Sequence, residues 1–381
     1  MTEIEAAAAP SADDIPNELV ENIYERPLRI LLATDAWMPQ VNGVVRTLNT
    51  LREELIGLGH TVEVLEPSRF RTFPLPSYPE IRIAIRAGGR AKEIIDAFAP
   101  DAIHIATEGP IGWAARAYCL KRKLPFTTSF HTRFPEYLHA RTRFPVAWSY
   151  NVLRNFHWPA AAVLVTTNSL KRELEARGFR NIRIWVRGVD TELFQPLPPG
   201  ERDWLGLPRP LFVYVGRVAV EKNLEAFLDL DLPGTKMIVG DGPQLTYLKA
   251  KYPGVHFAGT RHGAELARYY AASDCFVFPS RTDTYGLVVL EALACGVPVA
   301  AYPVQGPADI IGDYPVGAID EDLKAGALRA LQCDPVTCRN FALGFSWEAC
   351  ARQFVSHLEA RNVFRRRRRR RDPGGRGFNQ P

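Results

Sequence analysis

The sequence predicts an α/β protein built from two doubly wound domains, and three observations support this prediction. The chain has 381 residues, which is more than a single domain usually holds. Short apolar segments typical of buried parallel strands alternate with amphipathic, helix-like segments. The alternation lapses once, in the proline-rich stretch 194–200, and then resumes. We therefore expect domains at 27–193 and 210–345, joined by a linker at 194–209.

The first domain is predicted to begin with a β-α-β unit. Leu28–Thr34 is a short apolar strand, and a loop over 35–42 follows it. Gly43 then opens an amphipathic helix that Gly59 ends, and Thr61–Leu65 forms the second strand. Further strands, separated by helices as in a doubly wound sheet, are expected at Ile103–Ala106, Phe126–Phe130 and Ala162–Thr166.

The second domain repeats the pattern after the linker. Its expected strands are Leu211–Val215, Lys236–Val239, Val255–Ala258, Cys275–Phe278 and one that follows Pro298. Its expected helices are Leu224–Leu230, Leu245–Lys251 and a segment from about Tyr285 to Cys295. An amphipathic stretch from Trp347 to Arg361 predicts a last helix within 346–362.

The two ends of the chain differ sharply in charge. Residues 1–26 are acidic and low in complexity, and 363–381 are rich in arginine, so we expect both segments to be disordered. The formal net charge of +5 comes from this tail, because the chain without 361–381 carries a net charge of −3. A basic tail can bind nucleic acid or an anionic membrane. We expect no nucleic-acid partner, since no base-reading motif accompanies the tail.

Several features favour a cytoplasmic protein. The N-terminus lacks the basic and apolar regions of a secretory signal. No apolar segment reaches the roughly 18 residues that span a bilayer. The six cysteines are scattered without a CxxC pair, as expected for reduced packing thiols.

The segment from Phe276 to Ala301 is the strongest candidate for chemistry. It predicts a strand, a polar turn and an apolar helix whose single charge is Glu291. A buried carboxylate needs a partner or a ligand, and a second carboxylate, Asp283, lies in the turn. The helix start offers free N–H groups that suit a phosphate. The alternative is a core helix whose Glu291 pairs with an Arg or Lys from elsewhere.

Two cations are expected near the same end of the second sheet. Arg217 and Lys222 follow the strand Leu211–Val215, and two cations so placed can clamp a diphosphate. Each alone is more typical of an ordinary surface cation. Together with the acidic pair and the turn that begins at Gly240, they indicate a ligand site.

The first domain contributes fewer candidates. The bend at Asn42-Gly43 would let a phosphate approach the backbone, and His131 ends a strand at the edge that should face a ligand. Weaker candidates in this domain are Arg46, Glu108 and Arg133.

These motifs, taken in order, resemble a retaining glycosyltransferase of family 4. The resemblance covers about 27–361 and rests on Gly43-x-x-Arg46, His131 in FHTRFPEY, Arg187-Gly188-Val189-Asp190, GRVAVEKN, GDGP at Gly240 and Asp283-x7-Glu291. It implies the GT-B fold, with two Rossmann-like domains and a C-terminal helix that crosses back. The SRTDTYG sequence resembles the branch that glycosylates lipids, which includes sulfoquinovosyl-diacylglycerol synthases and GDP-mannose-dependent mannosyltransferases. The family more often has Glu at position 283 and Gly at position 42.

The resemblance also implies roles for individual residues. The donor would be a nucleotide-diphosphate sugar, with Arg217 and Lys222 on the diphosphate and Glu291 on the ribose. Asp283 would hold the sugar, and His131 would orient it for transfer. The remaining donor contacts would be Gly43, Gly240, Arg261, His262, Tyr285, Gly286 and Leu287.

Such enzymes need no protein nucleophile and no cofactor, since they act by positioning and by stabilising the leaving group. We also expect no metal. The acidic triplets 229–231 and 320–322 fall at a helix end and before a helix, where acids commonly cap and solvate.

The acceptor is predicted from surface composition alone. Basic and aromatic residues are interleaved at 69–73 and 133–148 of the first domain, which suits an anionic membrane surface. We therefore expect a lipid acceptor such as diacylglycerol and a peripheral location on the inner face of the membrane. The alternatives are a soluble or polysaccharide acceptor, a non-catalytic nucleotide-sugar or anionic-surface binding protein, and a GT-B phosphorylase or epimerase.

Overall fold

The computed structural model describes residues 27–40, 42–75, 78–131, 133–136, 142–198, 200–281 and 285–358. The segments expected to be disordered, 1–26 and 363–381, lie outside these residues. Within them the chain divides into two compact units. The N-terminal unit holds 27–165, 171–185 and 351–358, and the C-terminal unit holds 166–170 and 186–350.

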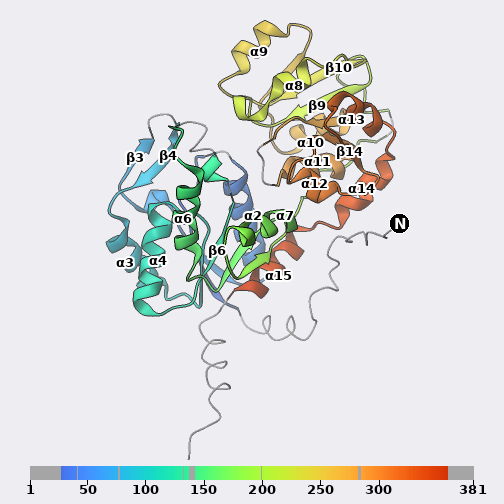
Figure 1. Ribbon diagram of the computed structural model, residues 1–381. Helices are drawn as coiled ribbons and strands as arrows, with labels where there is room; N and C mark the ends of the chain where they lie inside the picture. Colours follow the sequence, from blue (N-terminus) through green and yellow to red (C-terminus); the bar gives the residue numbers. More distant parts are fainter. Residues whose placement is uncertain are drawn as a thin grey trace, which may run out of the picture. The chain divides into compact units, whose positions relative to one another are not determined.

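The N-terminal unit contains a parallel sheet of six strands in the order β2-β1-β5-β6-β7-β8 (Figure 1). The strands are β1 (Arg29–Ala33), β2 (Thr61–Leu65), β5 (Ala102–Ile105), β6 (Thr127–Ser129), β7 (Ala162–Val165) and β8 (Ile182–Ile184). In register, Ile30 pairs with Val62 on one side and with Ala102 on the other. The central strands are buried on both faces, which explains why they are apolar throughout and do not alternate.

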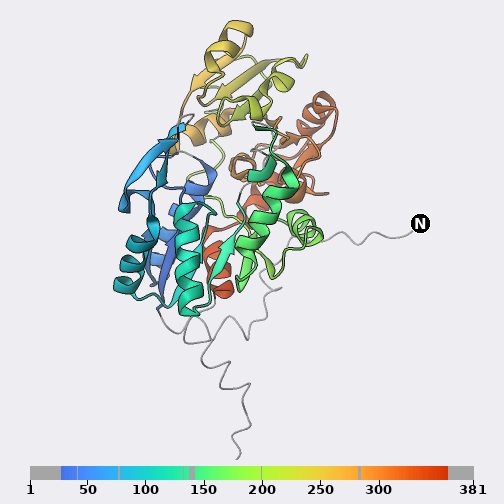
Figure 2. The same cartoon turned by 60° about the vertical axis from the view of Figure 1, so that its left-hand side comes forward.

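Helices cover both faces of this sheet (Figures 1 and 2). They are α2 (Gly43–Gly57), α3 (Ala87–Phe98), α4 (Pro110–Arg122), α6 (Val146–His157) and α7 (Asn168–Ala176). Neighbouring residues of a strand point to opposite faces. Thr127 accordingly contacts His104, whose ring packs on Phe354, while Thr128 contacts His157 of α6.

A short 3-10 helix, η2 (Pro67–Arg69), and an antiparallel pair, β3 (Thr72–Leu75) and β4 (Tyr78–Ala84), follow β2. The sequence did not indicate this pair, because Pro74 and Pro79 argue against strands. A two-stranded ribbon has only edge strands, and these tolerate proline.

The C-terminal unit repeats the architecture with the strand order β11-β10-β9-β12-β13-β14, again all parallel. The strands are β9 (Leu211–Val215), β10 (Thr235–Val239), β11 (His256–Gly259), β12 (Cys275–Phe278), β13 (Val299–Ala301) and β14 (Gly317–Ile319). The helices are η3 (Val220–Lys222), α8 (Leu224–Leu228), α9 (Leu245–Lys251), α10 (Gly263–Ala272), α11 (Leu287–Ala294), α12 (Pro307–Ile311), α13 (Leu323–Ala330) and α14 (Pro335–Leu343).

Two cores lie on the two faces of this sheet. Val213, Val215 and Phe276 pack with α10, α11 and α14 on one face. Phe212 and Tyr214 pack with α8, α9 and α13 on the other face. This alternation confirms a doubly wound domain with helices on both sides.

The last described helix, α15 (Trp347–His357), begins in the C-terminal unit and continues from Ala351 in the N-terminal unit. The predicted fold class, two Rossmann-like parallel-sheet domains with a final helix returning to the first, is confirmed. No helix in the described ranges combines the length and apolar character needed to cross a bilayer.

Candidate active site

The C-terminal sheet has a topological switch point between β9 and β12. From β9 the chain moves outward to β10 and β11, and then returns to β12 on the other side of β9. Ligands of open α/β sheets bind at the carboxyl ends of the strands that flank such a point. Arg217 and Lys222 follow β9, and Tyr285 and Gly286 follow β12. The structure therefore brings these four predicted residues to the expected position.

Glycine holds the neighbouring turns close together at this edge. Gly240 has φ +147°, and a Cβ there would lie 1.9 Å from the carbonyl oxygen of Gly216. The Gly240 N–H donates to Gly259 O at 2.9 Å, and the Gly216 N–H donates to Val239 O at 3.0 Å. Backbone hydrogen bonds thus join the turns that follow β9, β10 and β11, and the side chains on these turns share one edge.

A second set of contacts links the turns on the two sides of the switch point. The Asn223 amide donates to Pro279 O at 3.1 Å, and the Ser280 hydroxyl lies 3.5 Å from Glu221 O. Lys222 ends the 3-10 helix η3 and is half-buried, whereas Arg217 is exposed. Both cations are consequently carried on a turn that is anchored to the end of β12.

The start of α11 has the features expected of an anion site. Gly286 precedes the helix in a left-handed conformation with φ +85°, and no described side chain caps the first turn. The Val289 N–H donates to Gly286 O at 2.9 Å, and the N–H groups that precede it remain available to a ligand. Leu287, the first helical residue, is half-buried. The predicted sugar ligand Asp283 lies outside the described residues.

Buried Arg187 supports the residue before this helix. The backbone N–H of Arg187 donates to the hydroxyl of Tyr285, and both side chains are less than a tenth exposed. Burial lowers the pKa of Arg187 to about 10 and raises the pKa of Tyr285 above its usual value. The sequence singled out Arg187 only as part of a motif. Nothing in the sequence predicted its proximity to Tyr285.

Glu291 is buried in α11 with 3% of its surface exposed, as the apolar helix predicted. The hydroxyl of Tyr270, from α10, donates to its Oε2 atom at 2.9 Å. The core-helix interpretation expected an Arg or Lys partner from elsewhere, and the hydroxyl of Tyr270 is one donor to this carboxylate. Sequence reasoning missed Tyr270, since its periodicity in α10 is that of any core residue.

The turn after β11 carries the residues predicted for the base. Arg261 forms an ion pair with Glu265 at 3.1 Å, and its guanidinium lies 5.5 Å from the ring centre of Tyr269. His262 is exposed at the N-cap of α10. Both residues follow the outermost strand, β11, at the same edge of the sheet as Arg217 and Lys222.

The acidic triplets have partners within the fold. Asp229 accepts from the hydroxyl of Tyr252, and Lys324 pairs with Asp231. Asp322 caps α13 through Ala325 N, and Arg329 bonds to Asp320. Within the described part of the chain, no group of three or more His, Cys, Asp or Glu side chains is arranged to hold a metal ion.

The N-terminal sheet has its own switch point between β1 and β5. Gly43 begins α2 after β1, and Asn42 caps this helix by accepting from Val45 N at 3.0 Å. Gly43 lacks a positive φ, and a Cβ there would meet no atom within 4 Å, so the fold itself does not require glycine. His131 follows β6 at the same edge, with its ring 6.1 Å from that of Trp185.

The weaker candidates differ in their surroundings. Arg133 forms an ion pair with Glu173, which is the role of a structural cation. Arg46 is exposed on α2. Glu108 contacts the buried ring of His157 at 3.1 Å.

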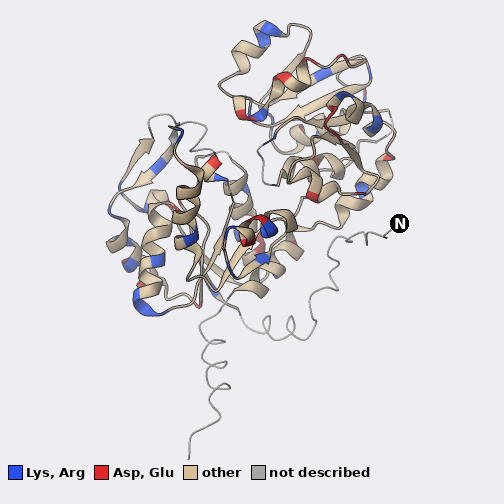
Figure 3. Ribbon diagram, viewed as in Figure 1, with Lys and Arg blue, Asp and Glu red and all other residues tan. Residues whose placement is uncertain are grey.

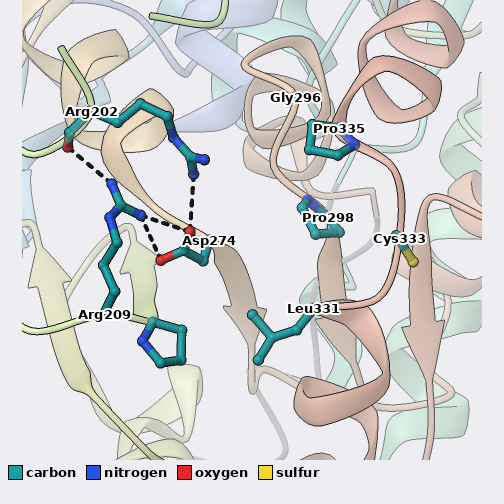
Figure 4. A pocket seen from close by; sticks show the side chains of 9 residues that line it. Arg202, Arg209, Asp274, Gly296, Pro298, Leu331, Cys333 and Pro335 are labelled. Carbon is teal, nitrogen blue, oxygen red and sulfur yellow. Dashed lines mark hydrogen bonds and ion pairs between the residues drawn. The ribbon is translucent and has the colours of Figure 1, made fainter. Parts of the chain in front are cut away.

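A pocket of about 460 Å³ lies at the opposite edge of the C-terminal sheet (Figure 4). Its lining includes Pro210, Asp274 and Pro298, which precede β9, β12 and β13. Arg209 makes two 2.7 Å contacts to the carboxylate of Asp274, and Arg202 a third at 3.1 Å. These groups fasten the segment before β9 to the sheet. None of the predicted donor residues lines this pocket.

Comparisons with known proteins agree with this arrangement. The family model described as Glycosyltransferase Family 4 matches residues 41–193, and that described as Glycosyl transferases group 1 matches 209–332. The chain is 33% identical to sulfoquinovosyl transferase SQD2 of Arabidopsis thaliana, over 68% of the chain and 52% of that protein. The match therefore spans about half the length of that relative.

Two further relatives match over more of their own length. The chain is 28% identical to a GDP-mannose-dependent alpha-mannosyltransferase of Mycobacterium tuberculosis, over 87% of the chain and 97% of that protein. Identity is 29% to alpha-monoglucosyldiacylglycerol synthase of Streptococcus pneumoniae, over 81% of the chain and 79% of that protein.

Solved structures share the fold at lower identity. Sucrose-phosphate synthase from Thermosynechococcus elongatus superposes with a TM-score of 0.70 at 22% identity, covering 91% of the chain and 100% of that structure. HepE of Anabaena, solved in complex with UDP-glucose, superposes with a TM-score of 0.63 at 16% identity, covering 86% and 98%. With both halves matched by family models, the chain belongs to glycosyltransferase family 4 and has the GT-B fold.

Proposed function

We propose that the chain is a retaining, metal-independent hexosyltransferase that uses a nucleotide-diphosphate sugar as donor. One observation carries the proposal: two cations after β9 and an uncapped helix start after β12 flank one switch point. Cations and free N–H groups together suit a diphosphate. The complex of HepE with UDP-glucose supports a donor of this class.

In this proposal Arg217 and Lys222 stabilise the charge that develops on the departing diphosphate. The N–H groups at Tyr285, Gly286 and Leu287 bind the same group, and Glu291 binds the ribose hydroxyls. Electrostatic stabilisation of a leaving group needs neither a protein nucleophile nor a metal ion. Arg261 and His262 would contact the base, and Asp283 and His131 would contact the transferred sugar. Gly43 would allow close approach to the phosphates.

The acceptor is proposed to be a membrane lipid such as diacylglycerol. The name of the Streptococcus relative includes diacylglycerol, which supports this choice. Trp148 and Phe134 of the N-terminal unit expose more than half of their surface, and tryptophan in particular is enriched at membrane interfaces. Lys121, Arg122 and Lys123 end helix α4, among basic and acidic positions that are interspersed over the unit (Figure 3). A cytoplasmic protein bound peripherally to the inner, anionic face of a membrane would use both features.

A soluble or polysaccharide acceptor is the second candidate. The name of the mannosyltransferase relative, which matches over nearly its whole length, specifies a donor and no lipid acceptor. Vesicle flotation separates the two candidates. Binding to vesicles that contain phosphatidylglycerol, together with transfer to dioleoylglycerol, supports the lipid acceptor. Absence of both results contradicts it.

The donor proposal is tested with a panel of UDP-, GDP- and ADP-sugars, read by thermal shift and by product analysis. At least one donor should stabilise the chain and lose its sugar to an acceptor. Lys222→Ala and Glu291→Ala should abolish the stabilisation, while Lys249→Ala, an exposed lysine on α9, should retain it. Sugar phosphate formed from free phosphate would indicate a phosphorylase, and an altered but untransferred sugar an epimerase.

A further inference from the structure

Glu108 lies at the switch point of the N-terminal sheet, directly beyond the carboxyl end of β5. Its side chain is 22% exposed. One carboxylate oxygen, Oε1, contacts Nε2 of His157 at 3.1 Å. Among the described residues this is the hydrogen bond that Glu108 makes, so Oε2 remains open to a ligand.

A buried chain of side chains holds this carboxylate in place. The ring of His157 comes from α6, and only 1% of it is exposed. Its Nδ1 atom bonds to the fully buried hydroxyl of Thr128 at 2.8 Å, and its Nε2 atom donates to Glu108. A carboxylate that accepts from an imidazole fixed at its other nitrogen has a defined orientation.

Glu108 is not needed to cap the helix that follows it. Asp35, at the end of β1, accepts from Ile111 N at 2.9 Å and from Gly112 N at 3.2 Å, which satisfies the start of α4. A Cβ at Gly109 would lie 2.3 Å from Cγ of Asp35, so the turn is tightly built around that carboxylate. Burial, with the charge of Glu108 as a lesser cause, raises the pKa of Asp35.

The carboxylate of Glu108 is thus held by His157 beyond the end of β5, and no capping role accounts for its position. Residues beyond the carboxyl end of a strand at a switch point are placed where open α/β sheets bind their ligands. A carboxylate accepts hydrogen bonds from hydroxyl groups and repels phosphate. The surroundings of Glu108, on the β5 side of the switch point, are therefore suited to a neutral hydroxyl-bearing group.

We propose that Glu108 binds the acceptor through the hydroxyl group that receives the sugar, and that His157 is its positioning residue. The proposal rests on the glycosyltransferase function proposed above. If Glu108 has this role, the part of the acceptor that contacts it must be an uncharged alcohol, such as the glycerol hydroxyl of a diacylglycerol or a sugar hydroxyl. The hydroxyl oxygen bonds to the anomeric carbon of the donor, the bond from that carbon to the diphosphate breaks, and the hydroxyl proton passes to Glu108. Water can take the same place when no acceptor is present, so Glu108 should also support slow donor hydrolysis.

The test uses the full chain with the nucleotide sugar that stabilises it in the donor panel. Sugar release to water and transfer to dioleoylglycerol in phosphatidylglycerol vesicles are both measured, alongside the Kd of the donor. We expect Glu108→Gln to lower kcat for sugar release on the order of 100-fold, while the donor Kd stays within about twofold. Glu108→Asp keeps the charge and should recover part of the loss.

Glu93→Gln is the matched control, since Glu93 is an exposed carboxylate of the same unit that pairs with Arg90. It should behave as the wild type in every assay. Turnover by Glu108→Gln within about threefold of the wild type, with donor bound, overturns the inference and leaves the proposed function standing. A wild-type chain that turns over no donor refutes the proposed function, and this inference with it. A loss of the Glu108→Gln thermal transition would show a structural role and also overturn the inference.

Discussion

Replacement of Gly240 by alanine tests the close approach of the turns at the donor edge. The added Cβ would lie 1.9 Å from Gly216 O, far inside van der Waals contact, on a backbone with φ +147°. The obstructing atom belongs to the backbone, so no side chain can rotate away. Either the turn after β9 or the turn after β10 must therefore move.

The cost can be worked from two contributions. A non-glycine residue in such a conformation costs about 1–3 kcal/mol. Movement of the turn would weaken the bonds from Gly216 N to Val239 O and from Val218 N to Asp241 O, at about 1 kcal/mol each. The expected destabilisation is about 3–5 kcal/mol, or a fall in Tm of roughly 6–20 °C for a unit of this size.

Thermal unfolding followed by circular dichroism measures this fall, and Gly259→Ala is the matched control. Gly259 also has a positive φ, +73°, but a Cβ there would meet no atom within 4 Å. That variant should lose only about 1–2 kcal/mol. Equal Tm values for the two alanine variants would refute the argument, because the clash at Gly240 would then have no energetic consequence.

Three further predictions concern partners seen in the structure. Tyr270→Phe removes the hydroxyl that donates to buried Glu291 at 2.9 Å and should lower the free energy of unfolding by about 1.5–3 kcal/mol. Urea titration measures this loss, and an unchanged unfolding midpoint would contradict the prediction. Asp274→Asn weakens the bonds that Arg202 and Arg209 make to this carboxylate, so Tm should fall while donor binding persists. Loss of donor binding in a chain that is still folded would be inconsistent with a purely structural role for these bonds. Burial lowers the pKa of His60 below its ordinary 6.5, so the unfolded chain takes up the proton first as pH falls. The free energy of unfolding should therefore decrease from pH 7 to pH 5, and His60→Asn, whose side-chain oxygen can still accept from Leu28 N, should flatten that slope.

The main strands could be predicted from the sequence because strands buried on both faces are apolar over their whole length. Thr61–Leu65, Leu211–Val215 and Cys275–Phe278 have the predicted bounds, and so does the helix Leu245–Lys251. The sequence did not indicate β14, a strand of three residues from Gly317 to Ile319 that pairs only with β13 at the sheet edge. A strand this short carries too few side chains for a pattern to be visible.

The candidate site was predictable only where it depends on local sequence. The burial of Glu291 follows from its apolar helical neighbours, and the positions of Arg217 and Lys222 follow from the strand before them. The bond from Tyr270 to Glu291 joins residues on two helices, and Arg187 lies about 100 positions before Tyr285 in the chain. Such contacts depend on how the helices pack, which neither periodicity nor spacing encodes.

The two units place opposite charges at equivalent points of the same topology. In the C-terminal sheet the strands that flank the switch point are followed by Arg217, Lys222 and an uncapped helix start. In the N-terminal sheet they are followed by Asp35 and Glu108, and Asp35 already occupies the start of the helix. A helix start closed by a carboxylate no longer favours a phosphate, whereas an open one does. The difference between these two helix starts therefore supports assigning the anionic donor to the C-terminal unit and a neutral hydroxyl to the N-terminal unit.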